Sequence, residues 1–126
     1  MKKNILIADD EESIRYTFTS FLEDAGYRVT TADSLSACIK KMQAESYDLL
    51  FLDIRMGRDN SIDTIQDLKI MQPNCSVVMI TGIQDFKTIV KARRFGAVDY
   101  LVKPVRQASL LYIVQKTLDN TVAVNQ

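Results

Sequence analysis

The stretch YDLLFLDIRMGRDNS, residues 47–61, decides the fold of this 126-residue chain. Its apolar run, residues 49–52, ends abruptly at Asp53 and gives way to a polar segment that contains a glycine. A short run that is apolar at every position is typical of a strand buried on both faces, as in the centre of a parallel sheet. The stretch therefore predicts a central strand, and it raises the question of why a carboxylate stands at the strand's end.

Short apolar runs and helical periodicity alternate along the rest of the chain. Five runs predict strands, at residues 4–9, 27–32, 48–53, 75–81 and 98–103. Apolar spacings of three and four predict helices at residues 14–25, 34–44, 63–71, 85–95 and 106–119. Because right-handed crossovers bury each helix against the sheet, the alternation predicts an α/β fold: a doubly wound five-stranded parallel sheet with helices on both faces.

Length and composition favour a single small domain without a general affinity for polyanions. We expect one domain over residues 1–120 and a tail or the start of a linker at residues 121–126. Sixteen basic and sixteen acidic residues leave no net charge to attract nucleic acid or a membrane surface. The chain contains no histidine and two distant cysteines, and its N-terminal apolar run is too short for a signal sequence, so we expect a cytoplasmic protein.

Polar groups stand at the ends of four predicted strands: Asp9 and Asp10, then Asp53, Thr81 with Gly82, and Lys103 with Pro104. Parallel strands end at the same edge of a sheet, where open α/β folds bind their ligands. Clustered carboxylates repel one another unless a dication balances their charge, and an all-oxygen site suits Mg²⁺ or Mn²⁺. Asp53 is then the expected nucleophile toward phosphorus, with Thr81 and Lys103 balancing charge on the phosphoryl oxygens.

The order and spacing of these residues, together with Tyr100, resemble the receiver domains of bacterial two-component response regulators along essentially the whole chain. The resemblance implies a flavodoxin-like fold with strand order 2-1-3-4-5. It also implies a metal held by Asp10, Asp53 and the carbonyl of Arg55, assisted by Asp9. A sensor histidine kinase would phosphorylate Asp53, so the domain would take part in its own phosphorylation and dephosphorylation without being a conventional enzyme.

The same resemblance implies a switch and its partners. Thr81 and Tyr100 would move after phosphorylation and alter the surface of the fourth helix, fifth strand and fifth helix. That surface would act on an effector domain, in the same chain or a separate one, or form a phosphorylation-dependent homodimer. The stretch ITGIQDFKTIVKARRFGAVDYLVKPV, residues 80–105, is most similar to regulators that activate alternative-sigma-factor transcription. The resemblance also makes a cis Lys103–Pro104 bond the expected isomer.

One departure from the family pattern follows Met56. The family usually carries Pro-Gly there, whereas this chain continues Gly57-Arg58-Asp59-Asn60. Without the fixed φ of proline we expect a more flexible loop, less ordered when no metal is bound.

Blander interpretations remain for several of these residues. Glu11 and Glu12 are expected to cap the first helix, and the basic residues 91–94 are expected to be a solvated surface. The alternatives for the chain as a whole are an interaction module that works without phosphorylation, a Mg²⁺-dependent aspartate-nucleophile phosphatase and a flavin binder. The phosphatase would need an acid where Arg55 stands, and the acidic DDEES loop, residues 9–13, would repel a flavin phosphate.

Overall fold

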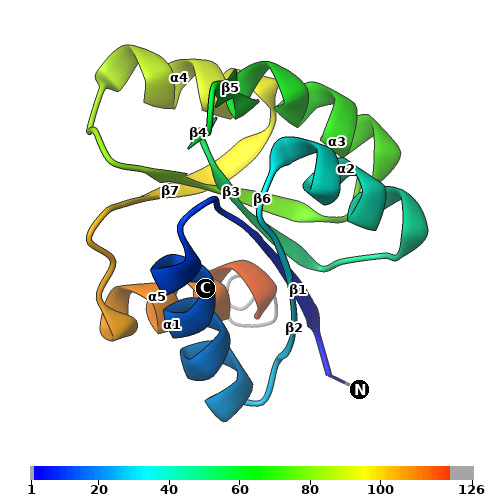
Figure 1. The fold of residues 1–126 in the computed structure, drawn as a ribbon, viewed down its shortest axis with the longest axis vertical. Helices are drawn as coiled ribbons and strands as arrows, with labels where there is room; N and C mark the ends of the chain where they lie inside the picture. Colours follow the sequence, from blue (N-terminus) through cyan, green and yellow to red (C-terminus); the bar gives the residue numbers. More distant parts are fainter. Residues whose placement is uncertain (1, 120–126) are drawn as a thin grey trace.

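A computed structural model describes residues 2–119, in which strands and helices alternate around one central sheet (Figure 1). The sheet is parallel throughout, with the order β2-β1-β3-β6-β7. Counted without the two strands of a separate hairpin, this order is 2-1-3-4-5, as predicted. The sheet strands are β1 (Asn4–Ala8), β2 (Arg28–Ala32), β3 (Leu49–Asp53), β6 (Ser76–Thr81) and β7 (Ala97–Val102).

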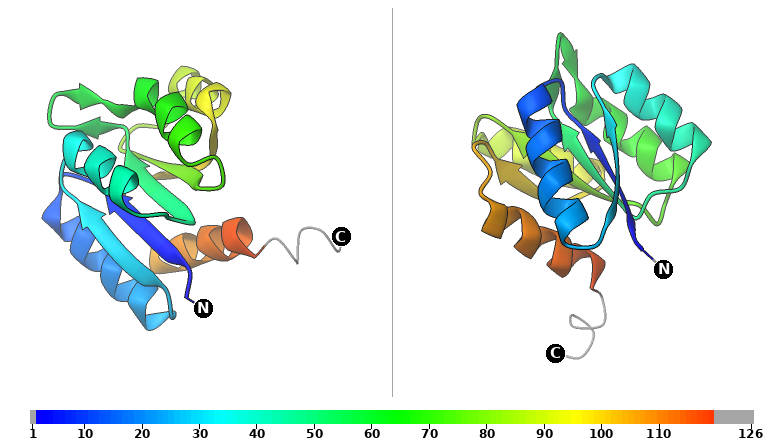
Figure 2. Two further views of the ribbon diagram at one scale, coloured as in Figure 1. Left: turned by 90° about the vertical axis from the view of Figure 1, so that its right-hand side faces the viewer. Right: turned by 60° about the horizontal axis from the view of Figure 1, so that its bottom comes forward.

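Helices cover both faces of the sheet, which confirms the doubly wound architecture (Figure 2). One face carries α1 (Glu12–Asp24) and α5 (Gln107–Leu118). The other carries α2 (Leu35–Ala44), α3 (Ile65–Met71) and α4 (Phe86–Phe95). Glycines with positive φ follow α1 and α4, at Gly26 and Gly96, as the sequence predicts for helix ends.

The central strand β3 supplies side chains to two separate hydrophobic clusters. Leu50 and Leu52 pack into the cluster under α2, α3 and α4, while Leu49 and Phe51 pack into the cluster under α1 and α5. The ring of Phe51 meets that of Phe18 edge to face, with centroids 5.6 Å apart. Since β3 is buried at every position, its last residue, Asp53, is held in place by the core on both sides of the sheet.

The segment after Asp53, where we expected an irregular loop, contains regular structure. It forms a two-stranded antiparallel hairpin, β4 (Arg55–Met56) and β5 (Asp59–Asn60), followed by the 3-10 helix η1 (Ser61–Thr64). Gly57 opens the two-residue turn with a φ of 61°, and no other residue of the turn has a positive φ, the pattern of a type II′ hairpin. The hairpin projects from the end of the molecule where β3 terminates (Figure 2).

The predicted tail, residues 121–126, lies outside the described residues. None of the helices within residues 2–119 combines the length and the apolar character needed to cross a bilayer.

Candidate functional site

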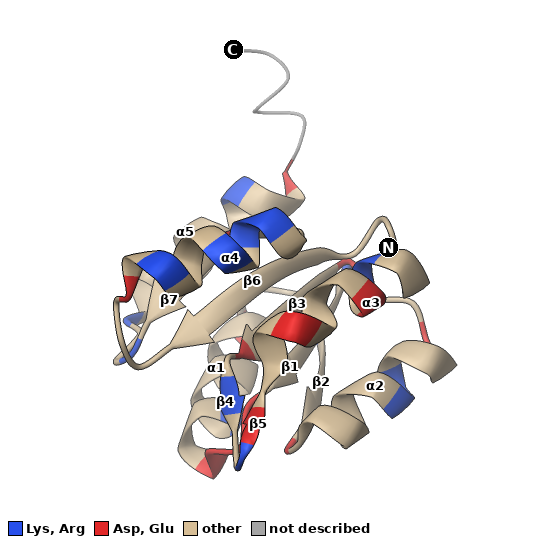
Figure 3. Ribbon diagram, turned by 90° about the horizontal axis from the view of Figure 1, so that it is seen from above, with Lys and Arg blue, Asp and Glu red and all other residues tan. Residues whose placement is uncertain are grey.

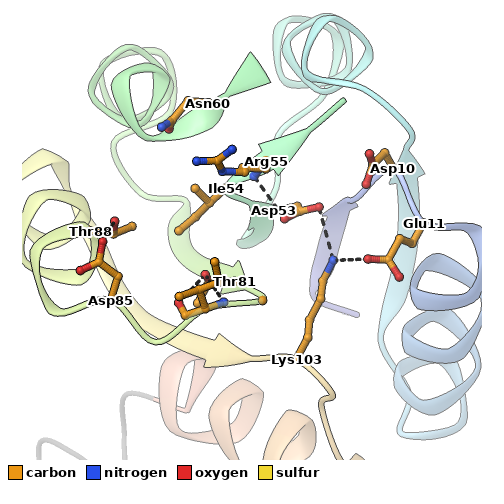
Figure 4. A pocket seen from close by; sticks show the side chains of 12 residues that line it. Asp10, Glu11, Asp53, Ile54, Arg55, Asn60, Thr81, Asp85, Thr88 and Lys103 are labelled. Atoms are coloured by element: carbon orange, nitrogen blue, oxygen red, sulfur yellow. Dashed lines mark hydrogen bonds and ion pairs between the residues drawn. The ribbon is translucent and has the colours of Figure 1, made fainter. Parts of the chain in front are cut away.

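The polar residues at the strand ends surround one cleft of about 430 Å³ (Figure 4). The cleft opens at the C-terminal edge of the sheet, where the connections after β1, β3, β6 and β7 diverge to helices on opposite faces. Its lining includes five residues that we predicted from the sequence: Asp10, Asp53, Arg55, Thr81 and Lys103. Tyr100 lies elsewhere, in a second groove between β7 and α5.

Three carboxylates meet in this region. Asp9, Asp10 and Asp53 each offer an oxygen, and these three oxygens lie within 4.8 Å of one another. The pairing of β1 with β3 explains their proximity, because Asp9 and Asp10 directly follow β1 and Asp53 ends β3. Asp9 is fully buried, and the charge of its Oδ2 is met by the ammonium of Lys103.

Asp53 is an unusually basic carboxylate. The residue is 4% exposed, and burial raises its pKa from 3.8 to about 7. The neighbouring charge of Asp9 adds to the increase, whereas Lys103 and a 3.3 Å hydrogen bond from the Arg55 backbone N–H oppose it. Removing water from this carboxylate therefore outweighs the positive charge that the protein places beside it.

Lys103 is shared among three carboxylates. Its Nζ lies 3.1 Å from Asp9 Oδ2 and 3.4 Å from Asp53 Oδ2, and it donates a 2.7 Å hydrogen bond to Glu11 Oε1. Burial by itself would lower the pKa of the ammonium, but these three acids raise it well above its usual value. Lys103 is therefore a fixed positive charge in the cleft, and its peptide bond to Pro104 is cis, as predicted.

Glu11 corrects our expectation of a helix cap. It occupies the N-cap position of α1, yet its side chain makes no capping hydrogen bond there. Its carboxylate instead reaches Lys103, 92 residues away in the sequence. An acid beside a helix N-terminus normally suggests capping, and no local signal in the sequence distinguishes this long-range contact.

The Thr81 hydroxyl is hydrogen-bonded to the backbone of Ile83 in this structure. Its Oγ1 donates a 2.8 Å hydrogen bond to the Ile83 carbonyl and accepts one of 3.1 Å from the Ile83 N–H. Gly82 follows, and a Cβ built on it would meet no atom within 4 Å, so space remains beside Thr81. Tyr100 is half-buried and packs against the hydrophobic cluster under α2, α3 and α4.

Two contacts to the acidic cluster were not predicted. Arg15 donates from Nη1 to the backbone carbonyl of Asp9 at 2.9 Å, and the Gly57 N–H donates to Asp10 Oδ2 at 2.9 Å. The first depends on the first turn of α1 folding back over β1. The second had a readable signal, since a glycine at the first position of a two-residue turn favours a hairpin.

The donor set suits a hard divalent cation. Three carboxylates gather around the single ammonium of Lys103, and both burial and the charge of Asp9 raise the pKa of Asp53, so a cation is needed to balance the cluster fully. All the available ligand atoms are oxygens, the preference of Mg²⁺, Mn²⁺ and Ca²⁺.

The chain is similar in sequence to a known transcriptional regulatory protein. The chain is 42% identical over 115 residues to the alginate biosynthesis transcriptional regulatory protein AlgB of Pseudomonas syringae pv. tomato, covering 91% of this chain and 26% of that protein. The chain thus spans about a quarter of the length of this curated relative.

Two solved structures share the fold. A response regulator from Burkholderia pseudomallei, determined with a phosphorylated aspartic acid, a calcium ion and citrate, has a TM-score of 0.85 and 31% identity, covering 98% of this chain and 73% of that one. The beryllofluoride-activated NtrC4 receiver domain dimer has a TM-score of 0.87 and 31% identity, covering 93% of this chain and 97% of that one. Residues 5–115 match the family described as the response regulator receiver domain, and the chain belongs to this family.

Proposed function

We propose that Asp53 accepts a phosphoryl group from a sensor histidine kinase and that Mg²⁺ is required for the transfer. The observation that carries this proposal is the set of three carboxylate oxygens within 4.8 Å, with Lys103 Nζ 3.1 Å from one of these acids and 3.4 Å from another. Asp10, Asp53 and the Arg55 carbonyl would hold the metal, with Asp9 assisting. When bound, the cation supplies positive charge to the carboxylates and to the phosphoryl oxygens. Mn²⁺ would fit the same donors.

The chain's own residues support an in-line transfer. A carboxylate oxygen of Asp53 attacks phosphorus while the P–N bond to the kinase histidine breaks, and the departing imidazole keeps the electron pair and takes up a proton. The product is an acyl phosphate on Asp53. Lys103, already 3.4 Å from Asp53 Oδ2, would neutralise one of the phosphoryl oxygens.

Thr81 and Tyr100 would convert this charge into a change of surface. To reach a phosphoryl oxygen, the Thr81 hydroxyl must leave the Ile83 carbonyl that it now contacts at 2.8 Å. Tyr100 would then turn into the space that Thr81 leaves, altering the face formed by α4, β7 and α5. Basic residues are frequent along α4, one of the elements of this face (Figure 3).

The partners follow from the family and from the relatives. AlgB is a transcriptional regulatory protein about four times as long as the matched segment, so we propose an effector domain that controls transcription, of the alternative-sigma-factor class. The NtrC4 receiver domain is a dimer when activated by beryllofluoride, which supports a phosphorylation-dependent homodimer for this chain. A cytoplasmic location would follow from these partners.

The test is the intact mass of the protein after incubation with acetyl phosphate and Mg²⁺. Wild type should gain one phosphoryl group, while Asp53→Ala and wild type with a chelator should gain none. Asp63→Ala is a matched control, because Asp63 is an exposed aspartate that pairs with Lys91 outside the cleft. If Asp53→Ala is still labelled, the acceptor is assigned wrongly; if wild type is never labelled, the chain is a phosphorylation-independent interaction module.

A further inference from the structure

The backbone amide of Gly57, in the turn of the hairpin β4–β5, contacts the acidic cluster. The proposed function gives this amide no role. This N–H donates a 2.9 Å hydrogen bond to Asp10 Oδ2. Building on the proposed metal site, we propose that Gly57 N–H is a positioning group for the cation: it fixes one oxygen of Asp10 so that the other faces the metal.

Asp10 is the ligand that most needs such a group. Asp9 is fully buried and Asp53 is 4% exposed, so the core fixes both carboxylates, whereas Asp10 is exposed. An exposed carboxylate samples several rotamers and loses that freedom when it binds an ion. A donor already bound to one oxygen limits the rotamers beforehand, as outer hydrogen bonds do for ligating carboxylates in metal sites.

The hairpin is anchored firmly enough to act as this donor. Met56 is 3% exposed and packs in the hydrophobic cluster under α2, α3 and α4. It also pairs with Asp59 across the turn. Below the hairpin, the Ser61 N–H donates a 2.7 Å hydrogen bond to the Ile54 carbonyl. The Gly57 amide is therefore fixed relative to β3, the strand that ends in Asp53.

The residue type at position 57 fits the role. A φ of 61° is readily adopted by glycine and strained for other residues, while proline has no N–H to donate and cannot reach this φ. Receiver domains usually carry proline after the corresponding methionine, so the donor belongs to this chain's own sequence.

The direct test replaces the amide by an ester. Substituting glycolic acid for Gly57 removes the N–H and keeps the backbone freedom of glycine. Native chemical ligation at Cys38 and Cys75 can assemble the full chain with no change of sequence at the junctions. Gly57→Ala is the matched control: it keeps the N–H, its Cβ would meet no atom within 4 Å, and it reports the strain at this φ alone.

Two measurements separate positioning from a general structural effect. Titration calorimetry should show that the ester binds Mg²⁺ about tenfold more weakly than wild type, and that Gly57→Ala binds less than about threefold more weakly. Phosphorylation by acetyl phosphate should be slower in the ester at limiting Mg²⁺ and equal to wild type at saturating Mg²⁺. In an Asp10→Ala background the ester should change the affinity no further.

The possible failures are distinguishable. Equal Mg²⁺ affinity in wild type and ester overturns the inference and leaves the proposed function intact. An ester that is slow even at saturating Mg²⁺, or that weakens binding in the Asp10→Ala background, overturns it in favour of a structural role. A wild-type chain that binds no Mg²⁺ overturns the proposed metal site and this inference together.

Discussion

Asp53 is the residue whose ionised form is most disfavoured by the arrangement of charges in this cleft. Four carboxylates, those of Asp9, Asp10, Glu11 and Asp53, lie around the single ammonium of Lys103. Burial raises the pKa of the Asp53 carboxyl to about 7, the charge of Asp9 adds to the increase, and Lys103, divided among three of these acids, offsets it only in part. Keeping Asp53 ionised in this buried position costs free energy. The metal-free domain is therefore less stable at neutral pH than it would be with a neutral residue at position 53.

This leads to a prediction for Asp53→Asn. The folded-state pKa of Asp53 is raised from 3.8 to about 7, so between these values the folded state binds more protons than the unfolded state and wild type loses stability as pH rises. Asparagine does not titrate, so the Asp53→Asn variant does not lose stability in this way as pH rises. The free energy of unfolding of Asp53→Asn, measured in urea without metal, should exceed that of wild type by about 2 kcal/mol more at pH 7 than at pH 4.

Mg²⁺ provides the control for this prediction. It should raise the stability of wild type at pH 7 and raise that of Asp53→Asn much less, because the variant has lost a charged ligand. A stability difference that does not change between pH 4 and pH 7 would show that burial does not perturb Asp53.

At the scale of elements, the hairpin β4–β5 joins the proposed metal site to the core. It carries Arg55, whose carbonyl we propose as a ligand, and Gly57, whose N–H contacts Asp10. The Gly57 N–H donates to Asp10 Oδ2, and the Ser61 N–H, just after the hairpin, donates to the Ile54 carbonyl. We predict that saturating Mg²⁺ slows hydrogen exchange of these two amides by up to about a hundredfold at 100 times the dissociation constant, because opening the hairpin would release the ion.

The amide of Gly26 serves as the reference for this measurement. It bonds to the Glu23 carbonyl at 3.0 Å, at the end of the sheet opposite the cleft, and its local opening does not disturb the site. Hairpin amides that exchange equally with and without Mg²⁺ would mean that the hairpin is formed independently of the ion.

On the scale of the whole molecule, the two free cysteines report whether the core is closed. Cys38 and Cys75 are both buried in the cluster under α2, α3 and α4, and burial raises the pKa of each thiol to about 12. The thiolate is the reactive form. We predict that neither cysteine reacts with a disulfide reagent at pH 8 on the timescale of minutes, and that both react at once in denaturant.

Ser20→Cys is the matched comparison, because Ser20 is exposed on α1. Its thiol should react within seconds while Cys38 and Cys75 remain protected. Rapid reaction of all three cysteines in the native protein would show that the cluster under α2, α3 and α4 opens readily.

Much of the molecule could be read from local patterns. Helix and strand bounds agree with the predicted ranges within two residues almost everywhere, because apolar periodicity reports which face of each element is buried. The exception is the segment directly after Asp53, where we predicted a loop without regular structure. The structure has a hairpin and a 3-10 helix there, since two to four residues carry too little periodicity to read.

The sequence by itself determined the layered α/β fold and the gathering of Asp9, Asp10, Asp53, Thr81 and Lys103 at one edge, because parallel strands must all end on the same side. Only the tertiary structure decided which of these groups touch. The bond from Lys103 to Glu11 spans 92 residues, that from Gly57 to Asp10 spans 47, and Thr81 turns to Ile83 instead of to Asp53. Such choices depend on how complete elements pack, and short-range sequence patterns carry no record of distances between strands and helices that meet only after folding.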